Sequence, residues 1–392
     1  MKVALVTSFP QRPESPRGGV EAVSVNLVRG LSECSELDVH VITLDRIPGP
    51  AVYTWSGATI HRIPREGVST LTEAISSGRK AITRYVDDLS PDIVHAHDTY
   101  GLMVKGIDLP RVLTIHGFVY RDTLFSHVRV AWMRSLLWRW FETRAWADQQ
   151  HIISISPYVR ERLAGVTTAT IHDIDNPISE EFFEAARKEQ EGTVLSAAVV
   201  SPRKNTLALI NAFALIVRKH PHASLRLAGP VVDESYARAV EMRIRELTLE
   251  QRVQLLGPIS AGQVRNELAA CSVFALVSLE ENSPMAIEEA MAVGIPIVTS
   301  NRCGMPYMVS HGQTGFLVEP NEVRGIANRI DQLLSDHRLR DRMGRRARAV
   351  AEERFHPAVV ARRTHEAYCE ILGLPLGISE AASMQEEQPC RR

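Results

Sequence analysis

Two carboxylates placed around the start of a helix form the most informative chemical pattern in the sequence. Residues 281–289 read Glu-Asn-Ser-Pro-Met-Ala-Ile-Glu-Glu, so Glu281 stands before the proline and Glu289 stands after it. Proline suits the first position of a helix, and serine is a good N-cap. The pattern therefore predicts a helix over residues 284–293, with Ser283 as its N-cap.

A helix start of this kind can hold a phosphate group, because its free N–H groups and its dipole favour an anion. The dipole contributes only about 0.3–1 kcal/mol at an exposed site, so it would orient a phosphate without driving a reaction. Pro284 has no N–H group, which leaves Ser283 and Met285 as the predicted phosphate contacts. Glu281 and Glu289 would then accept hydrogen bonds from sugar hydroxyl groups on either side. The plainer alternative is a surface acidic run followed by an ordinary packing helix.

The whole segment resembles the Glu-x7-Glu motif of the family 4 retaining glycosyltransferases, which have the GT-B fold. The match continues beyond Glu289 through Ala290, Met291, Ala292, Gly294 and Pro296. The resemblance covers about residues 1–372 and implies an α/β protein with two Rossmann-like, doubly wound domains facing each other across a cleft. It also implies retaining transfer of a sugar from a nucleotide-diphosphate sugar to an acceptor, in glycan, polysaccharide or glycolipid biosynthesis.

The resemblance assigns the donor diphosphate to a basic loop at residues 202–205. Lys204 matches the lysine of the family, which would stabilise the leaving phosphates as charge develops on them. The family generally has an arginine at the end of the preceding strand, where this chain has Ala198 and Val199. Either Arg203 takes over that contact or the phosphate site is weaker than usual.

The remaining expected roles rest on the same resemblance. Gly18 and Gly19 resemble the Gly-Gly loop of the family, where bare backbone lets donor and acceptor approach, although a plain turn explains the pair equally well. His116 ends a predicted strand and would contact the donor sugar together with Glu281, while Glu289 would hold the ribose. A purely structural histidine is the alternative for His116.

No nucleophile stands out, so the resemblance implies reaction on one face of the sugar, with the leaving phosphate accepting the acceptor's proton. It further implies that no metal ion and no cofactor takes part. His95, His97 and Asp98 leave three readings open, namely a metal pair, an acceptor-side lining or a structural cluster. Two rival functions also stay open, a sugar-nucleotide epimerase and a non-catalytic sugar-nucleotide-binding subunit. The missing strand-end arginine, and Tyr307 where members often have glutamate, favour the second rival.

Short apolar runs alternate with helical patterns along the chain, which is typical of βαβ units around a parallel sheet. The predicted strands are residues 2–8, 39–43, 92–95, 111–115, 152–155, 193–200, 224–228, 253–256, 273–276 and 296–299. The predicted helices include residues 20–31, 206–218, 284–293 and 358–372. In such folds ligands bind outside the carboxyl ends of the strands, so the site should lie there.

The pattern breaks around residues 178–192, which we interpret as a charged linker with one helical turn. We therefore predict an acceptor-side domain over residues 1–177 and a nucleotide-sugar-binding domain over residues 193–355. A last helix at about residues 357–372 would return to the first domain, as the resemblance implies. Residues 373–392 have the polar composition of a disordered tail.

The bulk composition excludes several classes of protein. The 392 residues are too many for one ordinary core, and the net charge of −1 gives no overall field for nucleic acid. The expected partners are therefore a UDP- or GDP-sugar donor and a glycan, lipid-linked or small-molecule acceptor. Five cysteines without metal-site or disulfide spacing indicate a reducing compartment. We expect no signal peptide and no spanning helix, and hence a cytoplasmic protein.

Residues 128–146 combine four tryptophans with four arginines. Aromatic and basic residues together suit a helix that lies on an anionic lipid surface, which would make the protein peripheral at the inner face of the membrane. The alternative is a helix that packs its tryptophans inward and exposes its arginines to water.

Overall fold

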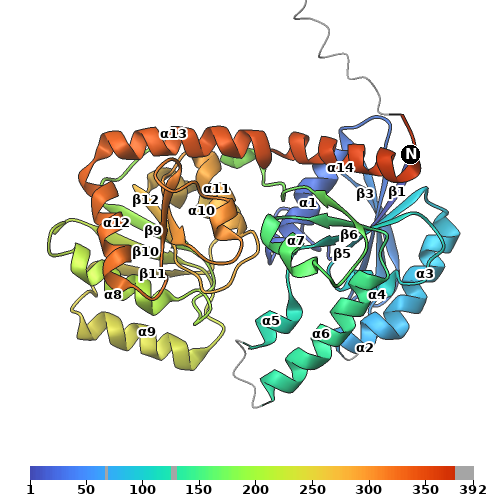
Figure 1. Cartoon of the computed structure of the whole chain (residues 1–392), viewed down its shortest axis with the longest axis horizontal. Coiled ribbons are helices and arrows are strands. Elements are labelled where there is room, and N and C mark those ends of the chain that lie inside the picture. Colours follow the sequence, from blue (N-terminus) through green and yellow to red (C-terminus); the bar gives the residue numbers. More distant parts are fainter. Residues whose placement is uncertain (67–68, 125–129, 376–392) are drawn as a thin grey trace, which may run out of the picture.

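The computed structural model describes residues 1–66, 69–124 and 130–375, which form two α/β domains connected by two long C-terminal helices (Figure 1). The first domain contains an eight-stranded sheet in the order β3-β4-β2-β1-β5-β6-β7-β8. All neighbouring strands are parallel except β3 and β4, which pair antiparallel at one edge. Its strands are β1 (Lys2–Val6), β2 (Asp38–Asp45), β3 (Ala51–Trp55), β4 (Ala58–Pro64), β5 (Ile93–His97), β6 (Arg111–Ile115), β7 (His151–Ser154) and β8 (Thr170–Asp173).

The helices of the first domain cover both faces of this sheet. They are α1 (Gly19–Ser32), α2 (Thr70–Ile75), α3 (Ser77–Leu89), α4 (Tyr100–Met103), α5 (Val119–Leu124), α6 (Ala131–Ala147) and α7 (Pro157–Leu163). Strand β1 explains the arrangement, since successive side chains of a strand point to opposite faces. Ala4 and Val6 belong to one buried cluster, whereas Val3 and Leu5 belong to another. A strand that is apolar on both faces must be covered on both, as in a doubly wound sheet.

The second domain repeats this plan with a six-stranded parallel sheet in the order β11-β10-β9-β12-β13-β14. Its strands are β9 (Thr193–Ala197), β10 (Ser224–Ala228), β11 (Val253–Gly257), β12 (Val273–Leu276), β13 (Ile297–Ser300) and β14 (Gly315–Val318). Its helical elements are η1 (Glu180–Phe182), α8 (Thr206–Ile216), α9 (Glu234–Glu246), α10 (Ala261–Ala270), α11 (Met285–Val293), η2 (Met305–Tyr307), α12 (Val323–Ser335) and α13 (His337–Arg354). Val194 and Leu195 again point into different buried clusters, so this sheet is also covered on both faces.

Helix α14 (Pro357–Leu372) follows α13 and crosses back to the first domain, as predicted (Figure 1). It packs against α1, where a Cβ on Gly30 would lie 2.8 Å from the Cβ of Ala361. The Tyr368 hydroxyl also lies 2.6 Å from Nδ1 of His95, the middle residue of β5. The chain therefore ties its two domains together through its C-terminal helix as well as through residues near position 178.

Most predicted elements are confirmed, and the fold class is the predicted one. Strands β6, β10 and β12 have the predicted bounds, and the predicted helical turn in residues 178–192 is η1. Sequence reasoning missed β3, β4, β8 and β14. Three buried apolar side chains near η1, Ile178, Phe182 and Phe183, pack into a core of the second domain. Residues 376–392 of the predicted tail and residues 128–129 of the predicted lipid-binding segment lie outside the described residues.

Candidate active site

A cavity of about 660 Å³ is lined by residues of both domains. Its walls from the first domain include Gly18, Gly19, Ala22 and Asn26, and those from the second include Ala198, Gly229, Ile259, Met285, Ala286 and Glu289. The carboxyl ends of β9, β10 and β11 lead into this set, which is the predicted position for a ligand in a doubly wound sheet. A cavity of this size is within the range of small-molecule sites.

Helix α11 begins at this cavity, one residue later than predicted. Pro284 is its N-cap, with φ −73° and ψ 112°, and the expectation that Ser283 would be the cap is wrong. The Ser283 hydroxyl instead donates to Glu288 Oε1 at 2.7 Å, so it is engaged inside the protein. The first N–H groups of a helix have no partner within it, and Met285 and Ala286 both line the cavity. Met285 and Ala286 therefore present the anion-binding end of α11 to the cavity. Ser283 does not line it.

Glu289 also lines the cavity, one turn inside α11. Loss of hydration by burial raises its pKa to about 8. Its neighbour Glu288 is fully buried, and burial raises the pKa of that carboxyl well above its ordinary value, against the opposing effect of the Ser283 hydrogen bond. Only Glu289 of the two is placed to contact a ligand.

Gly18 and Gly19 face α11 from the start of α1. Gly18 is the N-cap of α1 and Gly19 its first residue. A Cβ on Gly18 would meet no atom within 4 Å, and one on Gly19 would lie 3.8 Å from Met285 Sδ. No described protein atom is close enough to exclude a side chain at either position. The open space in front of α11 is therefore available to a ligand.

Lys204, Arg203 and Glu281 form a charged cluster on the loops that precede α8 and α11, and none of the three lines the cavity. The Glu281 carboxylate contacts the Lys204 ammonium and lies 3.2 Å from Arg203 Nη1. Burial alone would raise the pKa of Glu281, but Lys204 and Arg203 hold it below its ordinary value. The loop is positioned by Asn205, which adopts left-handed backbone (φ 57°) and donates from Nδ2 to the Val277 and Pro320 carbonyls. The structure thus brings the predicted lysine and the first motif glutamate into direct contact.

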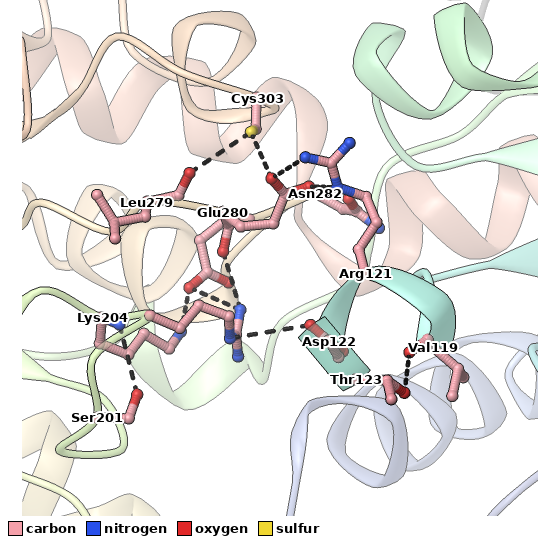
Figure 2. Close-up of polar contacts among 12 residues, drawn as sticks. Val119, Arg121, Asp122, Thr123, Ser201, Lys204, Leu279, Glu280, Asn282 and Cys303 are labelled. Carbon is pink, nitrogen blue, oxygen red and sulfur yellow. Dashed lines mark hydrogen bonds and ion pairs between the residues drawn. The ribbon is translucent and has the colours of Figure 1, made fainter. Parts of the chain in front are cut away.

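Glu280, which sequence reasoning missed, joins the two domains next to this cluster (Figure 2). Arg121 of α5 lies 2.7 Å from it, and the Tyr158 hydroxyl of α7 donates to its Oε1 at 2.7 Å. The Cys303 thiol donates to its Oε2 at 3.2 Å from within the second domain. Arg203 also approaches Asp122 of α5, at 3.9 Å. The sequence signal that could have revealed Glu280 is the acidic pair at positions 280 and 281. Glu281 contacts the basic loop of its own domain, whereas Glu280 contacts the first domain.

A backbone contact further holds the loop before α11. A Cβ on Gly304 would lie 1.6 Å from the Asn282 carbonyl oxygen, so only glycine fits there. The Gly304 N–H donates to the Glu281 carbonyl at 2.8 Å. The close approach of these two backbone segments explains why glycine stands at position 304, beside Cys303. Tyr307, the last residue of η2, donates its hydroxyl to Glu161 of the first domain at 2.6 Å.

His116 contributes its backbone to the domain boundary and its ring to the interior of the first domain. Its carbonyl accepts a hydrogen bond from Asn282 Nδ2 at 2.9 Å, while its ring lies 3.0 Å from Asn176 Oδ1 and 3.2 Å from His97 Nδ1. Burial lowers the pKa of His116, although Asp98 opposes that effect. The ring lies outside the lining of the large cavity.

The His-x-His-Asp run is built into the protein interior. His95 hydrogen-bonds through one ring nitrogen to Tyr368 and through the other to Thr114, both at 2.6 Å. Asp98 accepts from the N–H groups of His116 and Gly117. In the described part of the chain, no three His, Cys, Asp or Glu residues are grouped to hold a metal ion. The arrangement fits the structural reading of this cluster.

Three arginines line the cavity without having been predicted to do so, namely Arg17, Arg29 and Arg265. Ala198 and Val199 also line it, so the position of the missing strand-end arginine is a short, uncharged part of the wall. Arg265 forms an ion pair with Glu181 near η1. Isolated arginines without a motif gave no signal in the sequence, because only the fold brings them to one cavity.

Comparison with known proteins agrees with this architecture. The model of glycosyl transferases group 1 matches residues 177–350, and that of Glycosyltransferase Family 4 matches residues 17–182. An uncharacterized glycosyltransferase of Methanocaldococcus jannaschii is 24% identical over 83% of this chain and 88% of its own length. The alpha-maltose-1-phosphate synthase of Mycobacterium tuberculosis is 23% identical over 95% of this chain and 100% of its own length.

Solved structures show the same fold. Sucrose-phosphate synthase from Thermosynechococcus elongatus superposes with a TM-score of 0.78 at 21% identity, covering 95% of this chain and 99% of that one. Anabaena HepE, solved in complex with UDP-glucose, superposes with a TM-score of 0.71 at 18% identity, covering 94% of this chain and 100% of that one.

Two Rossmann-like domains with a ligand-sized cavity between them form the GT-B fold. Both family models that match the chain describe glycosyltransferases. The two family models together account for residues 17–350. The chain belongs to family 4 of the glycosyltransferases.

Proposed function

We propose that this glycosyltransferase uses a nucleotide-diphosphate sugar as donor and transfers the sugar with retention of configuration. The observation that carries the proposal is the cavity in which the free N–H groups of α11 and Glu289 face the open space at Gly18 and Gly19. A diphosphate suits the helix start, because backbone N–H groups and the dipole both favour an anion there. A ribose diol suits the carboxyl of Glu289.

In the proposed reaction the bond between the anomeric carbon and the leaving phosphate oxygen breaks on the face that the acceptor oxygen attacks. The acceptor hydroxyl proton passes to that phosphate oxygen, so the nucleoside diphosphate is itself the base. Lys204 and Arg203 lie on the loop between β9 and α8, whose first residues line the cavity, and stabilise the charge that develops on the diphosphate. Glu281, which holds both cations in the structure, positions them and contacts the transferred sugar.

HepE was solved with UDP and with UDP-glucose, which supports a nucleotide-sugar donor for this chain. The donor in our proposal is a UDP- or GDP-sugar. The proposed acceptor is a glycan, a lipid-linked precursor or a small molecule. The proposed reaction uses no metal ion and no cofactor, since the basic loop and the helix start supply the positive potential. We place the reaction in the cytoplasm, where nucleotide sugars and free thiols coexist.

The test combines a donor screen with product analysis. Thermal shift against UDP- and GDP-sugars should identify one nucleotide that raises Tm, and consumption of that donor should require an acceptor. A product that keeps the donor's anomeric configuration would support retention. Formation of that product in the presence of EDTA would support metal independence. Inverted product would overturn retention, and loss of turnover in EDTA would overturn metal independence. Conversion of the donor without any acceptor would indicate an epimerase instead.

A further inference from the structure

Helix α6 carries a large apolar surface that the fold leaves uncovered. Trp132, Met133, Leu136, Leu137 and Trp140 are each 47–61% exposed. The opposite side of the same helix is buried and includes Trp138 and Trp146, so the inward-packing alternative holds for these two tryptophans. An uncovered group of this kind on one helix marks an interaction surface.

The exposed apolar residues share one side of the helix. At about 100° per residue, they span an arc of about 140°. Arg139 borders this arc beside Trp132, and Arg134 borders it beyond Leu137. Arg144 lies within the arc near its C-terminal end and stacks on Trp140, with 3.9 Å between the guanidinium carbon and the ring centroid. Long basic side chains at the edges of an apolar strip keep their charges at a polar boundary while the strip is buried.

The charges on α6 are of one sign on this side. Its single carboxylate, Glu142, is buried and accepts from the N–H groups of Val119 and Tyr120. Within the described ranges, the ion pairs leave Arg134 and Arg139 without an acidic partner. An apolar strip with tryptophans and unpaired arginines complements a surface that has a negatively charged outer layer over an apolar interior. An anionic lipid bilayer has this layering.

We propose that the outer face of α6, from residue 130 to residue 144, binds an anionic bilayer with the helix axis in the plane of the lipid surface. None of the described helices has both the length and the apolar character to cross a bilayer, so the helix lies on the membrane. Its buried face keeps it attached to the first domain, and α5 packs between it and the second domain (Figure 1). Because Arg121 of α5 reaches Glu280, the lipid surface is brought close to the domain boundary.

This inference does not depend on the proposed transfer reaction, because lipid binding is measured without donor or acceptor. The full chain is sedimented with vesicles of phosphatidylcholine alone and with vesicles that contain an equal share of phosphatidylglycerol. We expect binding to the mixed vesicles only, weakening as salt is raised, since exposed charges are screened. Tryptophan fluorescence should shift to shorter wavelength and be quenched by brominated lipid, because Trp132 and Trp140 are exposed in free protein.

Substitutions separate the apolar and the charged contributions. Trp132→Gln with Leu136→Gln should weaken vesicle binding by at least about tenfold. Arg134→Gln with Arg139→Gln should weaken it by roughly 25-fold, at about fivefold for each charge near an anionic surface. All four side chains are exposed, so Tm should stay that of the parent protein.

A matched control removes exposed apolar groups from the other domain. Val232→Gln with Met242→Gln should leave vesicle binding unchanged. Three outcomes would overturn the proposal: no binding of the parent protein to mixed vesicles, equal binding to neutral vesicles, or full binding by both α6 variants. A dimer in solution that only the Trp132 and Leu136 variant dissociates would assign the face to a second copy of the chain, and would equally overturn it.

Discussion

The contact between Lys204 and Glu281 allows catalysis and stability to be separated in one experiment. Lys204→Met removes the charge and keeps much of the side-chain length. A lost electrostatic stabiliser typically costs about 10²–10³ in kcat, or about 2.7–4 kcal/mol. We therefore expect donor consumption to fall at least roughly a hundredfold, measured as nucleoside diphosphate released with a saturating acceptor.

Lys204→Met should also lower the stability of the folded protein, because it removes the contact with Glu281. The Lys204 and Glu281 side chains are 13% and 9% exposed, so among the described residues Glu281 would keep Arg203 as its one cationic partner. A lost hydrogen bond to a charged group costs about 1.5–3 kcal/mol. For a domain of this size, each kcal/mol lowers Tm by roughly 2–4 °C. The Tm of Lys204→Met should therefore fall by several degrees at neutral pH.

The pH dependence of that loss follows from Glu281. Its pKa in the folded protein lies below the ordinary value of 4.5, with burial opposed by Lys204 and Arg203. Its contribution to stability is therefore complete above pH 4.5 and is lost as pH falls through the lower, folded-state pKa. The difference in Tm between the parent protein and Lys204→Met should be full at pH 7 and should narrow below pH 4.5.

The double variant Lys204→Met with Glu281→Gln is the matched control. It removes the charge that Lys204→Met leaves partly unpaired, so Tm should recover in part while turnover stays low. Recovery of turnover together with Tm would show that the single variant was merely unstable. Near-parental turnover in Lys204→Met itself would exclude Lys204 as a stabiliser of the leaving diphosphate.

Three further outcomes follow from the site. Glu289→Gln should weaken donor binding, measured by calorimetry, yet raise Tm. The rise in Tm should grow from pH 4.5 to pH 8, because a Glu289 pKa of about 8 in the folded protein costs stability as pH rises. An unchanged Tm at pH 8 would contradict this. Glu280→Gln should loosen the domains and increase the radius of gyration in X-ray scattering, whereas the surface control Glu246→Gln should not. Gly19→Leu should fill the cavity and abolish donor binding at unchanged Tm, with Gly49→Leu as the control, and retained binding would exclude this cavity as the donor site.

Buried regular structure was the part of the fold that the sequence predicted well. Strands such as β6 and β12 are short apolar runs buried on both faces, so hydrophobicity marks them directly. Strand β3 was missed because its side chains are largely exposed at the sheet edge, and β14 because its four residues begin with glycine. Such strands are defined by pairing with neighbours, and pairing is not encoded in local composition.

The candidate site was predictable where a contiguous motif defines it. The segment from Glu281 to Glu289 predicted the start of α11 to within one residue, and Gly18 and Gly19 were placed at the same cavity by the fold. The error at Ser283 has a local cause, since the hydroxyl is taken by Glu288 one turn later.

The links between the domains were not predictable. Arg121 and Glu280 are separated by 159 positions, and no local pattern relates them. The turn of the His116 ring toward His97, away from the cavity, likewise depends on packing between distant strands. Contacts of this kind become visible only when both domains are placed.

A crystal structure with the sugar nucleotide that gives the largest thermal shift is the most direct test of the central claim. The diphosphate oxygens should lie within hydrogen-bonding distance of the Met285 and Ala286 N–H groups, and the ribose hydroxyls should contact Glu289. A nucleotide bound away from the start of α11, or a Glu289 carboxyl without contact to it, would contradict the proposed donor site.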